Sequence, residues 1–146
     1  MFNEQNKRLW PVIKLMVRAK RNKFWIEAVS CQYYYLVWQL RLLLHYKGEV
    51  SKNEIGKSRY LSTLNKKAFN KKLLTETEYK KIDSYNEKRG RLIHNLLNRD
   101  FEYNQWEVEY RKGSDLIGML QEKLIGKLKF GPEESYEDFL KKKLEK

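Results

Sequence analysis

Arg89 and His94 are the residues of this chain whose side chains could together transfer protons beside a bound phosphate. They lie five residues apart in the segment NEKRGRLIHNLL, residues 86–97, and the sequence contains only one other histidine. An imidazole can accept or donate a proton near neutral pH, and the rigid fork of a guanidinium can bind phosphoryl oxygens. The pair therefore predicts acid–base chemistry on a phosphate, provided that the fold brings the two side chains to one site.

The segment that contains the pair has the periodicity of a helix, which we expect from Thr75 to Asn98. Thr75 is the N-cap, and Glu78, three residues later, completes a capping box. At about 100° per residue, Arg89 falls on the apolar side of this helix and His94 on another face. The apolar stripe consists of Ile82, Tyr85, Leu92 and Leu96, with Ile93 beside it.

Each member of the pair also has an ordinary explanation. A lone histidine away from the apolar stripe is usually a surface residue in water. Arg89 could extend from the edge of the stripe to solvent. A guanidinium cannot be buried without partners for its charge. The sequence therefore predicts that Arg89 either reaches water or contacts a specific partner.

The basic charge of the chain is concentrated in its first two thirds. Residues 1–99 contain 22 lysines and arginines against 8 acidic residues, whereas residues 100–146 contain 9 against 11. Such a field attracts polyanions, among which RNA and DNA are common partners. The alternative is that the lysines serve only solubility.

The remaining composition narrows the classes of function. Cys31 is the only cysteine, and His45 and His94 are far apart in sequence, so we expect no disulfide framework, no metal site and no cofactor. The longest apolar stretch, residues 24–44, contains charged and amide side chains that oppose membrane insertion. Because the start of the sequence lacks a signal-peptide pattern, we expect a cytoplasmic protein without a membrane span.

The spacing of apolar residues predicts an all-α fold, a compact up-and-down bundle of four to five helices in one domain, residues 1–146. Residues 22–48 should form a long helix that is apolar around most of its circumference and is covered on several sides. A short amphipathic helix is expected within residues 57–74. Residues 1–21 are either a basic arm or an additional helix, and residues 132–146 should form a C-terminal helix.

A fourth helix is expected over residues 104–128. Its candidates for packing include Trp106, Val108, Tyr110 and Leu120, although Gly113 could break it.

The segment NEKRGRLIHNLL resembles the signature of HEPN domains, small all-helical proteins of prokaryotic toxin, antiphage and RNA-processing systems. That signature is an arginine and a histidine separated by four to six residues, and Arg89 and His94 enclose four. A long apolar helix and a connecting helix before the motif also resemble the family, over about residues 22–125. Gly90 departs from the Asn, Asp or His that many members carry after the arginine. Leu96 stands where one subgroup has a modifiable tyrosine, so such modification is not expected.

The resemblance implies a metal-independent endoribonuclease that acts as a toxin, a defence effector or an RNA-processing enzyme. In that reaction a 2′-hydroxyl attacks the adjacent phosphate, so one group must take the hydroxyl proton and another must protonate the leaving 5′-oxygen. His94 can do either, and Arg89 can stabilise the phosphoryl charge.

The two side chains differ by about 140° in direction and roughly 7.5 Å in height on a straight helix, so one subunit alone makes a poor site. A two-fold dimer that lays two such helices together would pool two copies of each residue. The resemblance implies such a homodimer, and Gly90 would allow close approach of the backbones.

Further residues are expected to support the pair. Lys88, Arg91 and Arg99 are the nearest candidates for holding an RNA backbone, and Asn86, Asn95 and Glu27 are weaker candidates for supporting contacts. Tyr33, Tyr34 and Tyr35 could stack on bases, although tyrosines in a buried helix more often belong to a core or an interface. The expected partners are RNA, a second copy and an antitoxin or other regulatory protein. The alternatives are a non-catalytic module of the same fold that binds RNA or protein, and a helical adaptor.

Overall fold

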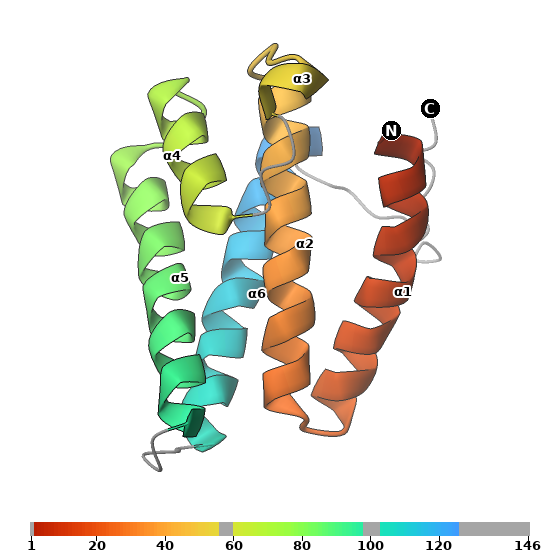
Figure 1. Ribbon diagram of the computed structural model, residues 1–146, viewed down its shortest axis with the longest axis vertical. Helices are drawn as coiled ribbons and strands as arrows, with labels where there is room; N and C mark the ends of the chain where they lie inside the picture. Colours follow the sequence, from red (N-terminus) through yellow and green to blue (C-terminus); the bar gives the residue numbers. More distant parts are fainter. Residues whose placement is uncertain (1, 56–59, 98–102, 126–146) are drawn as a thin grey trace.

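The computed structural model describes residues 2–55, 60–97 and 103–125, and all regular structure in these ranges is helical. The all-α prediction is confirmed. The described helices are α1 (Phe2–Arg21), α2 (Trp25–Tyr46), α3 (Lys52–Ile55), α4 (Leu61–Asn70), α5 (Glu76–Leu97) and α6 (Tyr103–Ile125) (Figure 1). The helix expected at residues 132–146 lies outside the described residues. None of the described helices has the length and hydropathy needed to cross a membrane.

The described part contains six helices where four to five were expected. One reason is α3, a single turn between the helices expected over residues 22–48 and within 57–74, where the Ser51 hydroxyl accepts the Glu54 N–H at 3.1 Å. The other is α1, which continues through Pro11 and packs against α2 with Leu9 and Ile13 buried. Residues 2–21 are therefore a packed helix and not an arm.

The central helix of the bundle is α2. It packs against α1, α4 and α6 as well as the short α3, so its apolar circumference is covered on several sides, as predicted. Its buried apolar residues occupy every side of the helix and include Val29, Tyr35, Leu36, Leu40, Leu43 and Leu44.

Two glutamines set the register between α2 and α6. Gln32 Nε2 donates to the carbonyl of Tyr110 at 2.7 Å, and Gln39 Nε2 donates to the carbonyl of Ile117 at 3.0 Å. Both pairs are separated by 78 residues, so the two helices run parallel, which Figure 1 also shows. Helices α2, α4 and α6 run in one direction and α1 and α5 in the other, so the up-and-down alternation is broken where α2 is followed by α4.

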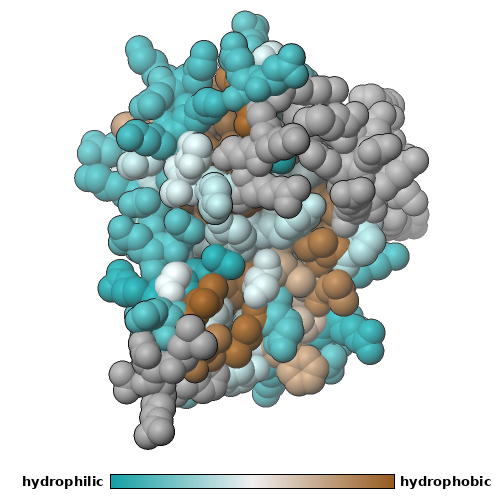
Figure 2. Space-filling view, in the orientation of Figure 1, coloured by the Kyte–Doolittle hydropathy of each residue, from teal (hydrophilic) through white to brown (hydrophobic). Residues whose placement is uncertain are grey.

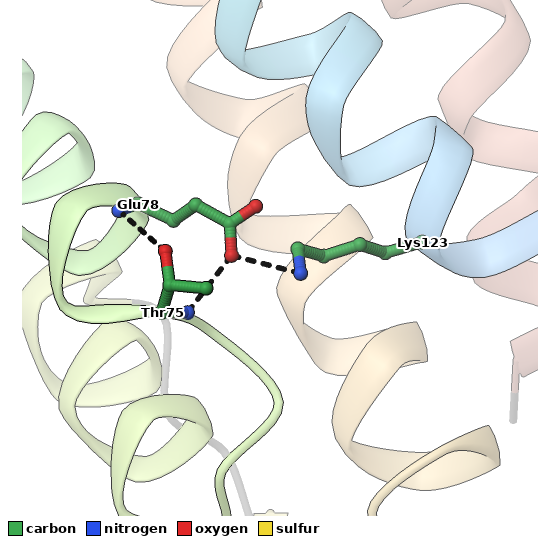
Figure 3. A network of polar contacts seen from close by, with 3 residues as sticks. All are labelled: Thr75, Glu78 and Lys123. Carbon is green, nitrogen blue, oxygen red and sulfur yellow. Dashed lines mark hydrogen bonds and ion pairs between the residues drawn. The ribbon is translucent and has the colours of Figure 1, made fainter.

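The start of α5 is fixed by the predicted capping box. Glu78 N–H donates to the Thr75 hydroxyl at 3.2 Å, and Thr75 N–H donates to Glu78 Oε1 at 2.8 Å. Lys123 of α6 adds an ion pair to the same carboxylate oxygen at 2.8 Å (Figure 3). One side chain thus caps α5 and joins it to the C-terminal half of α6.

This network makes the stability of the fold depend on pH. Burial by itself raises the pKa of the Glu78 carboxyl, but hydrogen bonds from Lys123 and Thr75 outweigh it, and the pKa lies below its ordinary value. A carboxyl group whose pKa is lower in the folded than in the unfolded protein stabilises the fold at pH values above its unfolded pKa. This contribution is lost as the pH falls through the folded pKa. Glu78→Gln should lower the free energy of unfolding by about 1–2 kcal/mol at pH 7.

Urea unfolding of both proteins between pH 7 and pH 3 measures this difference, which should shrink as the pH falls because wild-type Glu78 becomes increasingly protonated. The control is Glu87→Gln, whose exposed pair with Arg91 spans 3.8 Å and should contribute less than about 0.5 kcal/mol. Equal effects of the two substitutions at pH 7, or a difference that does not vary with pH, would contradict the assignment.

Candidate functional site

Arg89 lies on the inner side of α5, as its position in the apolar stripe predicts. Its guanidinium carbon lies 3.8 Å from the centroid of the Tyr33 ring of α2, the geometry of a cation–π contact. The side chain is half-buried, and its Nε atom is buried without a hydrogen-bond partner. Within the described ranges no carboxylate forms an ion pair with Arg89. Among the described residues, the partner of Arg89 is thus an aromatic ring and not an acid.

Beside Arg89, the interior between α2, α5 and α6 is polar. The Tyr85 hydroxyl donates to Gln32 Oε1 at 2.9 Å, while Gln32 Nε2 donates to the Tyr110 carbonyl and, at 3.3 Å, to the Ser114 hydroxyl. Burial raises the pKa of Tyr85, and the nearby positive charge of Arg89 opposes this shift without cancelling it. Tyr85 therefore remains a neutral hydrogen-bond donor at physiological pH.

His94 lies on the solvent-facing side of α5, also as predicted from its spacing. Arg89 points toward α2, so one subunit does not bring the two side chains together. Gly90, one turn before His94, is open, because a Cβ atom added there would meet nothing within 4 Å. Arg89 therefore lies on the side of α5 that faces α2, and His94 lies on the side that faces solvent.

The apolar stripe of α5 is not covered along its whole length. Ile82, Tyr85 and Leu92 are buried, but Ile93 and Leu96 are 38% and 39% exposed. The expectation that Leu96 packs inside is therefore wrong for the described part of the chain. Figure 2 shows hydrophobic surface between α5 and α2 in the half of the molecule where α5 ends.

The short length of α4 explains this opening. At 1.5 Å per residue, α4 is about 15 Å long and α5 about 33 Å. Phe69 stacks on Tyr79 at 4.7 Å between ring centroids, and Asn65 donates to the carbonyl of Tyr79 at 3.0 Å. These contacts place α4 beside the first half of α5, so it does not shield the second half.

Val108 of α6 is a second packing prediction that is wrong, since it is 51% exposed. Its neighbours Trp106, Glu109 and Tyr110 face inward, so position 108 falls on the outer side of the helix. Gly113 does not break α6, which is continuous from Tyr103 to Ile125.

The residues predicted to hold RNA are only partly described. Lys88 is half-buried on α5, and Arg91 is exposed and pairs with Glu87 at 3.8 Å, whereas Arg99 lies outside the described residues. Exposed lysines without an ion pair to a described residue continue over α4 and the start of α5, and Figure 2 shows this region as hydrophilic surface. They are Lys66, Lys71, Lys72 and Lys81.

The weaker candidates are dispersed around the bundle. Asn86 and Asn95 are half-buried on α5, and Glu27 is exposed near the start of α2. Burial raises the pKa of the Cys31 thiol, and the Glu27 carboxylate raises it further. This places Glu27 beside Cys31, and no contact with Arg89 or His94 is seen. Within the described ranges, no three His, Cys, Asp or Glu side chains lie close enough together to bind a metal ion.

Two residues of this site were not assigned their roles from the sequence. Tyr33 was expected to stack on bases or to belong to the core, but it contacts Arg89. Gln32 is one of the amide side chains that interrupt the apolar stretch of residues 24–44. Its spacing of seven from Gln39, which places both amides on one side of α2, was the available signal.

Comparisons of the chain with models of protein families, with curated proteins and with solved structures gave no match.

Proposed function

We propose that this protein is a metal-independent endoribonuclease that acts as a homodimer, with Arg89 and His94 of both subunits at the shared contact. The observation that carries the proposal is the uncovered second half of α5. There Ile93 and Leu96, both more than one third exposed, lie on the same side of α5 as Arg89, within the turn that also carries the exposed His94. Adjacent exposed apolar side chains next to a polar functional group are typical of an interaction surface.

A two-fold contact through this part of α5 supplies what one subunit lacks. In an isologous contact the same segment of each subunit meets its copy, so the motif of one subunit comes beside the motif of the other across the two-fold axis. The open backbone at Gly90 allows a close approach at that axis. The apolar side chains of Ile93 and Leu96 would be part of the area buried in such a contact.

The pooled residues suffice for transesterification of RNA. One His94 takes the proton of the 2′-hydroxyl as its oxygen bonds to phosphorus. The bond from phosphorus to the 5′-oxygen breaks, and the second His94 protonates that oxygen. Arg89 donates hydrogen bonds to the phosphoryl oxygens, where negative charge increases in the transition state. The products are a 2′,3′-cyclic phosphate and a 5′-hydroxyl.

The charge of the chain supports RNA as the substrate. The exposed lysines of α4 and α5 and the arginine at position 91 lie on the helix that carries the motif and on the helix packed against it. Such a surface binds phosphates without reading sequence, and its affinity should fall steeply with added salt. From the resemblance to HEPN domains we propose a role as a toxin, a defence effector or an RNA-processing enzyme restrained by a protein partner.

The second candidate is a module of the same fold that binds RNA or a protein without cleaving RNA. The observation that favours it is the separation of Arg89 from His94 within one subunit, because a chain that remains monomeric could not assemble the site.

Substitution of Leu96 separates these functions. The wild-type protein should sediment as a dimer and cleave single-stranded RNA in the presence of EDTA. Leu96→Asp places a charge in the proposed contact, so the protein should sediment as a monomer and lose about 100-fold or more in cleavage rate, the usual contribution of proton transfer. Sedimentation and the release of 2′,3′-cyclic phosphate ends measure the two effects.

The matched control is Val108→Asp, an exposed apolar residue on the outer side of α6, which should leave both properties unchanged. A wild-type monomer, or a Leu96→Asp monomer with full cleavage activity, would contradict the shared site. A dimer that binds RNA but does not cleave it would favour the second candidate.

A further inference from the structure

The contact between Arg89 and Tyr33 bridges two helices that do not otherwise approach each other closely. No described Cα atom of α2 lies within 8 Å of one in α5. Two long side chains of α5, Tyr85 and Arg89, span this distance and reach Gln32 and Tyr33, which are adjacent on α2. The position of the Arg89 guanidinium therefore depends on what α2 presents to it.

The Tyr33 ring is fixed from its far side as well. Its hydroxyl accepts the N–H of Leu61, the first residue of α4, at 3.2 Å. The N-cap residue Tyr60 provides no side-chain hydrogen bond there, so Tyr33 supplies a partner for a helix-end amide that would otherwise lack one. The ring is thus held by its own helix and by α4, and it presents its face to α5.

An aromatic partner leaves Arg89 able to bind a phosphate. A carboxylate would neutralise the guanidinium and occupy its N–H groups, which point outward from the edge of the planar group. A ring stacked on the flat face attracts the cation but leaves those edge donors free. The two Nη nitrogens of Arg89 form no hydrogen bond with any described residue, so no described acceptor occupies their donors.

We propose that Tyr33 is a positioning residue, which orients the guanidinium of Arg89 for a phosphate without neutralising it. This inference rests on the proposed function of Arg89, but the stacking itself can be measured without RNA. Stacking limits the rotamers of a flexible side chain before the substrate binds, which is a gain through preorganisation.

Three variants distinguish the effect of the Tyr33 ring from the effect of its hydroxyl and from a general loss of stability. Tyr33→Phe keeps the ring and removes the bond to Leu61, whereas Tyr33→Leu removes both. Tyr34→Leu is the matched control, because Tyr34 is the next residue of α2 and is 44% exposed. Thermal unfolding of each variant sets a temperature at which all four proteins are folded.

The first measurement is the NMR shift of the Arg89 side-chain protons, assigned by comparison with Arg89→Lys. Protons above the face of an aromatic ring are shielded, so the wild type, Tyr33→Phe and Tyr34→Leu should show upfield shifts. Tyr33→Leu should return these signals to the values of a free arginine. Unshifted Arg89 protons in the folded wild type would overturn the proposal, whatever the protein does to RNA.

The second measurement is RNA cleavage by the same proteins. Tyr33→Leu should lose about tenfold in cleavage rate, within the range that a partly desolvated cation–π contact supplies, and Tyr33→Phe should keep most of it. Adding Tyr33→Leu to Arg89→Ala should cause no further loss, because the ring acts only through Arg89. A Tyr33→Leu protein with unshifted Arg89 signals and wild-type cleavage would overturn the positioning role. Shifted wild-type signals without any cleavage would support the stacking and contradict the proposed function instead.

Discussion

Gly113→Ala should destabilise the fold by about 3 kcal/mol or more, a large share of the total stability of a small domain. A Cβ atom at position 113 would overlap the Oε1 and Cδ atoms of Gln32. That amide cannot move aside without loss, because it is buried and bonded to Tyr85, Tyr110 and Ser114. The expected cost combines overpacking with buried polar groups left without partners.

Gly118 of the same helix provides the control for this prediction. A Cβ atom there would meet nothing within 4 Å. Gly118→Ala should therefore raise the free energy of unfolding by about 0.5–1 kcal/mol, since alanine restricts the unfolded chain and favours a helix. Urea unfolding followed by circular dichroism measures both changes. Two variants with the same midpoint would show that Gly113 is not a site of close contact between α6 and Gln32.

His94→Ala should reduce RNA cleavage by at least about 100-fold, because proton transfer by a positioned imidazole usually contributes that much or more. The loss should be one of catalysis and not of folding. His94 is exposed and forms no hydrogen bond with a described residue, so its removal should change the free energy of unfolding by less than about 0.5 kcal/mol.

RNA binding by His94→Ala distinguishes catalysis from recognition. Its affinity for RNA should remain within a few-fold of wild type, and should keep the same steep dependence on salt, because lysines and arginines supply the phosphate contacts. The control is Ser84→Ala, which removes another exposed polar group from α5 and should preserve cleavage. Unchanged cleavage by His94→Ala would contradict an enzyme that depends on this histidine, and equal losses of cleavage and RNA affinity would assign His94 to binding.

The polar interior connects the fold to the candidate site. Gln32 accepts a hydrogen bond from the hydroxyl of Tyr85, which lies one turn before Arg89 on α5. The adjacent Tyr33 ring stacks on the Arg89 guanidinium. The same amide bonds to α6, so α2, α5 and α6 meet at one side chain. A change at Gln32 or Gly113 is therefore expected to move Arg89 as well as to weaken the core.

The sequence by itself determined the features that depend on near neighbours along the chain. The capping box of Thr75 and Glu78 marked the start of α5 within one residue, because both of its hydrogen bonds connect residues three apart. Apolar periodicity gave α2, α4, α5 and α6, and the apolar circumference of α2 predicted that several helices cover it. The opposite faces of Arg89 and His94 followed from helical geometry alone.

Only the tertiary structure decided which residues meet across the bundle. Arg89 meets Tyr33, and Gly113 meets Gln32, across separations of more than fifty residues. Leu96 and Ile93 have the same apolar character as Leu92, yet they are exposed because α4 is too short to reach them. The physical reason is that a side chain's own chemistry sets which face of a helix it occupies, whereas its burial and partners depend on the length, direction and register of the helices packed against that face.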